Sequence, residues 1–356
     1  MKSKAAIEEF LNVIKQSDNI FLDPDKNLDE QGKVDAYRHL FSIMRTAIDF
    51  YLFNDPLYPS FKLLADEHHK ILGDNVDAVY YFTQLRGDQE YVIKGKRYES
   101  CYLSFCTYGG APDGSIVDRV ANNINHRQIE FDEDGSFEIK LTPNPHGKNE
   151  FKLDEDVVNM FTREYFFDRF NSRESDLHIE NISDTEIKKA LNDDELAARI
   201  KVMSTFFEQY TWIAPLPVEF PTNDFLPPFE FEADQGSWGT IDNVYCFGRY
   251  NLKENEYLKI EFTSPECCYW GIQTWNYIMQ SMDYENYKVC INKGNAIPNA
   301  DGSYTIYMSH EPMDVDNWIS TAAYREAIIF CRWLLAEELP EQPKVECLML
   351  PLVASV

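Results

Sequence analysis

The sequence predicts a mainly β protein: two tandem jelly-roll-like antiparallel β-sandwiches from an internal duplication, plus an N-terminal helical region and a linking helix. Three observations lead to this prediction. Two long stretches consist of short runs rich in aromatic and β-branched residues, separated by Gly-containing turns. Apolar residues at helical spacing occur outside those stretches. The two stretches also share an ordered series of short matches.

The first 77 residues have the spacing of helices. Ile7, Phe10 and Ile14 indicate a short helix near the start. A longer helix is expected to follow, with Asp29 and Glu30 near its N-terminus, where carboxylates are favourable. The apolar face of this second helix is expected to contain Tyr37, Phe41, Met44, Ile48 and Tyr51.

Residues 78–182 are expected to form the first sandwich and residues 243–356 the second. Between them, residues 183–242 are predicted to be a linking helix followed by a Pro-rich linker. Ser183 and Glu186 have the spacing of a capping box at the start of that helix. Its apolar stripe is expected to be Leu196, Ile200, Met203, Phe207 and Tyr210, and the linker prolines are Pro215, Pro217, Pro221, Pro227 and Pro228.

The two strand-rich stretches match each other in order, at separations of 166 to 169 residues. The clearest match is a turn, in which Asp134-Gly135-Ser136-Phe137 recurs as Asp301-Gly302-Ser303-Tyr304. Glycine supplies the backbone freedom that such a turn needs. Other matches pair Glu90-Tyr91 with Glu256-Tyr257, Cys101-Tyr102 with Cys268-Tyr269, Ile124-Asn125 with Ile291-Asn292, and Arg163 with Arg332. This series predicts two copies of one sandwich.

Arg163 and Arg332 each lie inside an apolar run that could be helix or strand, and the duplication favours strand in both. An arginine in a buried run needs a partner. Two alternatives stay open at this point. The partner is either a carboxylate on a neighbouring strand, or an anion held in a cleft between the copies.

Charge and composition exclude several classes of protein. The chain has 60 acidic and 33 basic residues, a net charge of −27, which argues against binding nucleic acid or an anionic membrane. No apolar run approaches the roughly 18 residues of a membrane-spanning helix. Glu8 and Glu9 stand where a signal peptide would be apolar. The eight cysteines form no C-x-x-C pair and suit buried thiols in a reducing compartment, so a cytoplasmic protein is expected.

All six Trp residues follow residue 210, so the second copy is the better candidate for a ligand surface. Trp275 is close in sequence to amide, hydroxyl and carboxylate groups, a mixture that binds sugars and polar aromatic compounds. The alternative is that the Trp residues belong to the core and the polar residues to a loop. The expected ligand-binding residues are Trp275, Asn276, Gln280, Ser281, Asp283, Asn292, Trp318 and Arg325.

A catalytic site is the rival interpretation. Asp283 or Asp314, together with His310, could act as general acid or base if burial shifted a carboxyl pKa. A metal held by His126, His310 and a carboxylate is a further alternative, but no H-E-x-x-H or H-x-H motif supports it and no metal is expected. No cofactor is expected either, because the G-x-x-x-x-G-K-[ST], G-x-G-x-x-G and G-x-S-x-G motifs are absent.

Short segments spread over residues 35–340 carry a resemblance to a known family. They include Gly73-Asp74-Asn75, Tyr91-Val92-Ile93-Lys94-Gly95, Asn125-His126-Arg127, Arg163-Glu164-Tyr165-Phe166, Trp238-Gly239-Thr240, Gln280-Ser281-Met282-Asp283 and Asn317-Trp318. In these segments the chain resembles the bacterial proteins that carry domain of unknown function 1214. The resemblance implies a jelly-roll-like β-sandwich fold and no established activity. Tyr324 departs from the family pattern, in which a His is expected beside Arg325.

We therefore expect a protein that binds a small polar, glycan-like or aromatic ligand, in a cleft of the second sandwich or between the two. The alternative is a hydrolase or lyase that uses the acidic residues and His310. A third interpretation is a subunit of a homo-oligomer, for which an exposed apolar patch would be the sign.

Overall fold

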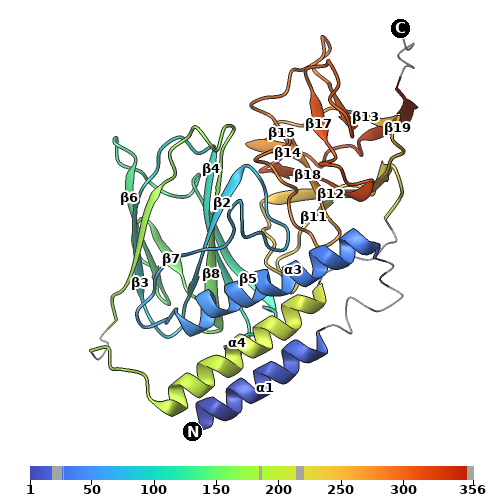
Figure 1. Cartoon of the computed structure of the whole chain (residues 1–356). Helices are drawn as coiled ribbons and strands as arrows, with labels where there is room; N and C mark the ends of the chain where they lie inside the picture. The colour runs from blue at the N-terminus through green and yellow to red at the C-terminus, as the bar shows by residue number, and fades with distance from the viewer. Residues whose placement is uncertain (18–25, 27, 184–186, 214–219, 351–356) are drawn as a thin grey trace. The chain divides into compact units, whose positions relative to one another are not determined.

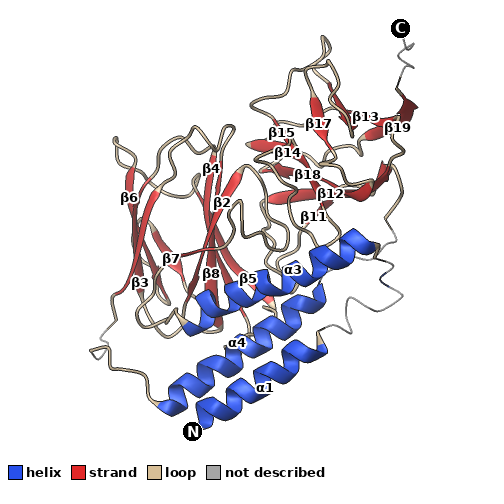
Figure 2. Ribbon diagram, in the orientation of Figure 1, coloured by secondary structure: helices blue, strands red, loops and turns tan. Residues whose placement is uncertain are grey.

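The computed structural model covers the whole chain (Figure 1). The structure describes all residues except 18–25, 27, 184–186, 214–219 and 351–356. The prediction of a mainly β protein with an N-terminal helical region and a linking helix is confirmed. Figure 2 shows the division into helices and strands.

The chain forms two compact units, and each is assembled from three stretches of sequence. The first unit consists of Met1–Ile71, Ala78–Pro215 and Glu232–Ile241. The second unit consists of Leu72–Asp77, Leu216–Phe231 and Asp242–Val356. The N-terminal helices therefore belong with the first sandwich. Each unit also contains a short segment that comes just before a stretch of the other unit. Leu72–Asp77 belongs to the second unit and precedes Ala78 of the first, and Glu232–Ile241 belongs to the first unit and precedes Asp242 of the second.

The first unit begins with helices. They are α1 (Lys2–Gln16) and α3 (Glu30–Ala47), which continues into a π-helical turn at Ile48–Leu52, and later α4 (Asp193–Ile213). Phe10 of α1 meets Phe207 of α4 edge to face, with ring centroids 5.4 Å apart. Phe50 stacks on Phe82 of the neighbouring strand, at 3.6 Å between centroids. Aromatic contacts of this kind join the helices to one another and to the sheet.

Helix α3 begins as expected but buries a different face. Asp29 is its N-cap and accepts a hydrogen bond from the backbone N–H of Gly32. The expected face is only partly buried. Tyr37 is 39% exposed and Phe41 is 69% exposed, whereas Met44 and Ile48 are half-buried and Tyr51 is buried. The small and branched side chains one position away fill the interior instead, since they allow close approach of the neighbouring elements. These buried residues are Ala36, Leu40, Ile43 and Ala47.

Helix α4 begins ten residues later than the predicted capping box. Asn192 accepts hydrogen bonds from the backbone N–H groups of Asp194 and Glu195, while the Glu195 carboxylate accepts one from the N–H of Asn192. Glu186 and the first linker prolines, Pro215 and Pro217, lie outside the described residues. The predicted stripe on α4 is otherwise confirmed, because its buried residues include Ile200, Met203, Phe207 and Tyr210.

Two sheets form the sandwich of the first unit. One has the order β1-β2-β8-β4-β5 and the other the order β7-β6-β3-β9. The strands are β1 (Lys62–Leu63), β2 (Ala78–Gln84), β3 (Tyr91–Lys96), β4 (Tyr102–Gly109), β5 (Arg119–Asn125), β6 (Ser136–Thr142), β7 (Glu150–Lys152), β8 (Val157–Tyr165) and β9 (Asp176–Asn181).

The second unit has the same arrangement, with one sheet ordered β10-β12-β18-β14-β15 and the other β17-β16-β13-β19. The strands are β10 (Asp224–Phe225), β11 (Phe229–Glu230), which pairs with β12, β12 (Asn243–Asn251), β13 (Glu256–Phe262), β14 (Tyr269–Trp275), β15 (Cys290–Asn292), β16 (Tyr304–Ser309), β17 (Trp318–Ser320), β18 (Glu326–Leu334) and β19 (Lys344–Met349). Part of the expected Pro-rich linker is thus built into this sheet as β10 and β11.

The matching strand orders agree with the internal repeat read from the sequence, whereas descent of both sandwiches from one copied unit stays a prediction. Arg163 and Arg332 lie in strands, as predicted. Arg163 is on β8, which pairs with β2 and β4, and Arg332 is on β18, which pairs with β12 and β14. Pairing is antiparallel throughout, except that β6 pairs with β7, and β16 with β17, in parallel.

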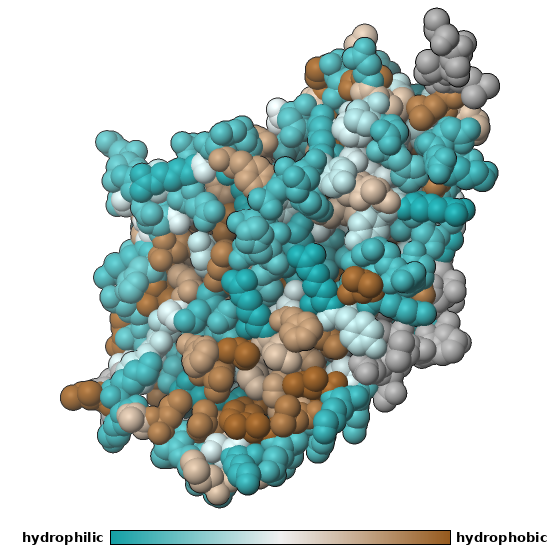
Figure 3. Space-filling model, in the orientation of Figure 1, coloured by the Kyte–Doolittle hydropathy of each residue, from teal (hydrophilic) through white to brown (hydrophobic). Residues whose placement is uncertain are grey.

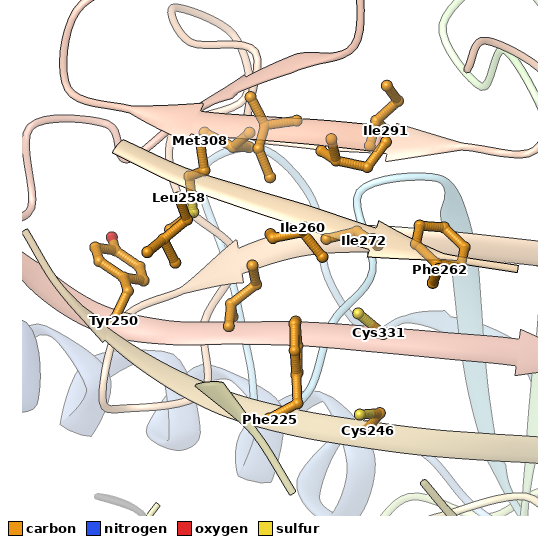
Figure 4. Packing of buried hydrophobic residues seen from close by; sticks show 14 of the residues in the cluster. Phe225, Cys246, Tyr250, Leu258, Ile260, Phe262, Ile272, Ile291, Met308 and Cys331 are labelled. Carbon is orange, nitrogen blue, oxygen red and sulfur yellow. The ribbon is translucent and has the colours of Figure 1, made fainter. Parts of the chain in front are cut away.

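Each sandwich has its own core. In the first unit it includes Ile93, Phe105, Ile139 and Met160. In the second unit the core side chains of the two sheets point toward one another (Figure 4). Cys246 and Cys331 face the core from paired positions of β12 and β18. We call the opposite face of the β10-β12-β18-β14-β15 sheet its outer face.

Apolar side chains are also exposed on the helices of the first unit. Figure 3 shows them gathered where Figure 1 places α1, α3 and α4. They include Ile7 and Leu11 of α1 and Val34, Tyr37 and Phe41 of α3. Assembly into a homo-oligomer stays a prediction. Within the described residues, every helix is too short or too polar to cross a membrane.

Candidate ligand site on the second unit

The site begins with a segment that is remote in sequence. Residues 72–77 precede β2, yet they belong to the second unit and lie on the outer face of its larger sheet. Side chains alternate between the two faces of a strand, so the neighbours of the core residues Trp270 and Ile272 on β14 point outward. These outward side chains provide the hydrogen bonds that hold the 72–77 segment.

Three donors converge on one carboxylate oxygen of Asp77. The hydroxyl of Tyr269 donates to Oδ2 at 2.7 Å, the amide of Asn292 at 2.9 Å and the thiol of Cys290 at 3.1 Å. Tyr269 and Asn292 have no exposed surface, and Asp77 is 7% exposed. A buried carboxylate is costly unless donors surround it, and this arrangement provides them.

The protonation of two of these donors follows from their surroundings. Burial, and then the nearby Asp77 carboxylate, raise the pKa of the Tyr269 hydroxyl well above its ordinary value. The same two causes raise the pKa of the Cys290 thiol well above its ordinary value. Both groups therefore keep their protons near neutral pH and act as donors. Cys290 is thus unsuited to be a thiolate nucleophile.

Asp74 provides a second anchoring point. Its carboxylate accepts hydrogen bonds from the backbone N–H of Ser281, at 2.9 Å, and from the Ser281 hydroxyl. Its backbone carbonyl accepts from the amide of Gln273 at 2.7 Å and from the indole of Trp275 at 2.9 Å. Backbone and side chain of one residue therefore contact both the strand and the loop after it.

Arg332 extends the cluster along β18. Its guanidinium donates to the carbonyl of Gly73 at 3.3 Å, a partner that the sequence did not suggest. It also lies over the ring of Phe330, with 4.6 Å between the guanidinium carbon and the ring centroid. The ring of Phe330 in turn stacks on Trp275 at 4.0 Å between centroids.

The structure gathers five of the residues expected to bind a ligand. Three of them contact the 72–77 segment directly, Trp275 and Ser281 at Asp74 and Asn292 at Asp77. Asn276 and Gln280 form the turn that carries Ser281, in which Asn276 Oδ1 accepts from the N–H of Gln280 at 3.1 Å. All five are buried, and Trp275 is only 1% exposed.

The other expected ligand residues lie elsewhere in the second unit. Asp283 is exposed and caps a turn by accepting from the backbone N–H and the amide of Asn286. Trp318 lies on β17 of the other sheet and donates to the hydroxyl of Ser309 at 2.8 Å. Arg325 is exposed just before β18.

His310, one of the residues considered for catalysis, has structural partners on both sides of its ring. His310 Nε2 donates to the carbonyl of Leu252 at 3.1 Å, so in the neutral ring Nδ1 accepts from the hydroxyl of Thr321, at 2.7 Å. Both ring nitrogens are therefore used to hold backbone and side chain in place. Asp314 is exposed in the loop before β17.

Sequence reasoning missed Asp74, Asp77, Tyr269, Gln273 and Cys290. Gly73-Asp74-Asn75 contributed to the family resemblance, and Tyr269 is one of the repeated positions, so both signals were present. The expected place of the Trp residues also needs a correction. Trp212 and Trp238 belong to the first unit, because α4 and residues 232–241 pack there. In the described part of the chain, no group of three metal-binding side chains comes together.

Comparison with known proteins supports the resemblance predicted from the sequence. Residues 249–338 match the family model described as "Protein of unknown function (DUF1214)". The predicted resemblance is confirmed. The matched segment includes β14, β15 and β18, which carry most of the donors described above.

Two solved structures are similar to the chain over most of its length. An uncharacterized protein from Burkholderia cenocepacia is 28% identical, with a TM-score of 0.88, and the alignment covers 97% of this chain and 96% of that one. The VPA0106 protein from Vibrio parahaemolyticus is 12% identical, with a TM-score of 0.52, covering 88% of this chain and 98% of that one, and shows the fold alone. No curated protein matches the chain.

Proposed function

We propose that the second unit is a binding module for a small polar ligand, recognised on the outer face of its larger sheet. The observation that carries the proposal is the convergence of Tyr269, Cys290 and Asn292 on Asp77. Buried polar networks are costly when incomplete, and ligand sites combine a few such groups with aromatic walls. Here Trp275 and Phe330 form the aromatic wall.

Binding is favoured over hydrolase or lyase chemistry by the surroundings of the titratable groups. General acid–base catalysis needs two such groups within hydrogen-bond reach of one reacting atom. His310 uses both ring nitrogens on Thr321 and Leu252, and Asp283 caps an exposed turn. The donors around Asp77, in contrast, are suited to recognition because they stay protonated.

A thermal-shift screen of the full chain tests the proposal. The compounds are neutral sugars, sulfated sugars, hydroxylated aromatic compounds and amino acids. A ligand that binds only the native state, at a free concentration of 100 times its Kd, stabilises the folded protein by about 2.7 kcal/mol. We therefore expect at least one compound to raise the melting temperature. Tyr269→Phe removes only the hydroxyl that contacts Asp77 and should abolish the shift.

Tyr250→Phe is the matched control. Tyr250 is also fully buried in the second unit and loses one hydroxyl, but it belongs to the core rather than to the outer face. The shift should survive in this variant. Equal shifts in both variants, or no shift with any compound, would contradict the proposal.

We also propose that the protein acts in the cytoplasm. The support is that none of the eight cysteines, all of which lie in the described part of the chain, forms a disulfide, and that Cys106, Cys246 and Cys331 have no exposed surface. Fractionation of the producing cells tests this. Recovery of the chain in an exported fraction would contradict the location.

A further inference from the structure

The outer face of the second unit presents mainly donors to the 72–77 segment. Seven side chains donate hydrogen bonds to the segment. They are the Tyr269 hydroxyl, the Cys290 thiol, the Asn292 amide, the Gln273 amide, the Trp275 indole, the Ser281 hydroxyl and the Arg332 guanidinium. Three groups accept instead. Gln273 Oε1 accepts from the backbone N–H of Val76, the Tyr269 hydroxyl also accepts from the amide of Asn75 at 3.4 Å, and the carbonyl of Met279 accepts from the N–H of Gly73. A surface of this kind matches a ligand rich in acceptors.

The donors form two subsites for carboxylates. One is made by the N–H and hydroxyl of Ser281, which both bond the Asp74 carboxylate. The other is made by Tyr269, Cys290 and Asn292 around Asp77. Between the subsites, Gln273 bonds the backbone on both sides, at the carbonyl of Asp74 and the N–H of Val76. The two subsites are occupied by the two carboxylates of one Asp-x-x-Asp sequence, Asp74 to Asp77.

This surface is unusual in a chain with a net charge of −27, because such a chain repels anions at long range. Carboxylate recognition at short range then depends on the geometry of the neutral donors, while Arg332, which is 4% exposed, binds the backbone carbonyl of Gly73. Neutral donors keep their strength across the physiological pH range. The raised pKa values of Tyr269 and Cys290 are consistent with that role.

We propose that the outer face of the second unit is a binding site for acidic peptide segments with two carboxylates in an Asp-x-x-Asp arrangement, and that residues 72–77 are its internal occupant. This inference rests on the proposed binding function and names its ligand class. The internal segment competes with any external ligand, so it regulates access to the site. Removing the carboxylates of Asp74 and Asp77 weakens the binding of the internal segment and leaves the donors of the outer face in place.

The test uses the full chain and a fluorescent peptide of residues 72–78, Leu-Gly-Asp-Asn-Val-Asp-Ala. The double variant Asp74→Ala, Asp77→Ala should bind the peptide at least tenfold more tightly than the unmodified chain, as measured by fluorescence anisotropy. A peptide with Asn in place of both Asp residues should bind at least tenfold more weakly. If the double variant does not fold, judged by circular dichroism, the single variant Asp74→Ala serves the same purpose.

Two further variants locate the binding. Ser281→Ala, added to the Asp74→Ala, Asp77→Ala variant, should weaken binding of the peptide, because the Ser281 hydroxyl donates to the first carboxylate. Ser303→Ala is the matched control, since Ser303 is on a turn of the same unit and bonds Asp301 instead. It should leave binding unchanged.

The outcomes separate the inference from the proposed function. Equal binding of the Asp and Asn peptides, or no binding by a folded variant that lacks the carboxylate of Asp74, overturns the carboxylate site. If a sugar or aromatic compound still raises the melting temperature in a Tyr269-dependent manner, the binding function stands and only its ligand class is wrong. Absence of both effects overturns the two together.

Discussion

Residues 72–77 and residues 232–241 are bound by equivalent positions of two similar sheets. In the first unit, Arg163 donates to the carbonyl of Trp238, and Tyr108 donates to the carbonyl of Gly239. In the second unit, Arg332 donates to the carbonyl of Gly73, and Trp275 donates to that of Asp74. Tyr108 and Trp275 occupy equivalent positions in the two sheets. Tyr108 pairs with Asn159, four positions before Arg163, and Trp275 pairs with Ile328, four positions before Arg332.

The backbones are thus held alike, while the side chains at matching positions differ. Trp238 packs between Tyr210 and Phe161, at 4.3 and 4.5 Å between ring centroids, whereas its counterpart Gly73 has no side chain. Asp74 corresponds to Gly239, and its carboxylate is held by Ser281. The comparison shows that one backbone arrangement can be secured by apolar burial or by carboxylate recognition. The second solution is the one with chemistry that an external ligand could use.

The largest effect is expected at the apolar anchor. Trp238→Ala removes an indole that contacts Tyr210, Phe161 and Phe206, so it should lower the free energy of unfolding by about 3 kcal/mol. Urea unfolding followed by far-UV circular dichroism measures this. Trp212→Ala is the control, since that side chain is 56% exposed, and it should change stability by less than about 0.5 kcal/mol. A small effect at Trp238 would remove the apolar half of the comparison.

The next effect is expected at the polar anchor. Asp77→Ala leaves the buried donors of Tyr269 and Asn292 without their acceptor and should cost about 2 kcal/mol. Asp301→Ala, at an exposed turn, is the control and should cost less. Similar losses in both variants, measured by urea unfolding, would show that burial around Asp77 has no energetic weight.

Sequence patterns indicated the strands, the repeat and five residues of the outer face, because strand periodicity and turn glycines are local signals. The turn Asp134-Gly135-Ser136 and its copy at 301–303 are examples. The patterns missed the partners of those residues, because Asp74 and Asp77 are about two hundred positions away from Ser281 and Asn292. Local spacing cannot reveal such pairs. It also placed Tyr37 and Phe41 of α3 on the buried face, although both side chains are exposed.

The repeated turn offers a finer comparison of the units. Gly135 and Gly302 have φ of +86° and +85°, so alanine at either position costs about 1 kcal/mol of backbone strain. A Cβ at Gly135 would also lie 2.5 Å from the carbonyl oxygen of Arg97, whereas a Cβ at Gly302 meets nothing within 4 Å. Gly135→Ala should therefore lower the thermal midpoint more than Gly302→Ala. Equal shifts would show that the two turns have the same surroundings.

The smallest effect is expected at Glu164, which stands where the second unit has the apolar Trp333. Burial raises the pKa of the Glu164 carboxyl above its ordinary value of 4.5 despite hydrogen bonds from Ser175. The folded state therefore binds this proton more tightly than the unfolded state, and the stabilisation is lost as pH rises above about 4.5. Glu164→Gln should reduce that loss, measured by urea unfolding at pH 4.5 and pH 7. An unchanged pH dependence would contradict this origin.

A double-mutant cycle on Asp77 and Tyr269 tests most directly whether the second unit recognises carboxylates. The free energies of unfolding are measured for Asp77→Ala, Tyr269→Phe and the double variant. Because the hydroxyl donates to Asp77 Oδ2 at 2.7 Å within the buried outer face, we predict a coupling energy of about 1 to 2 kcal/mol. Losses that add to within about 0.3 kcal/mol would mean that the two groups do not interact, and would contradict the account.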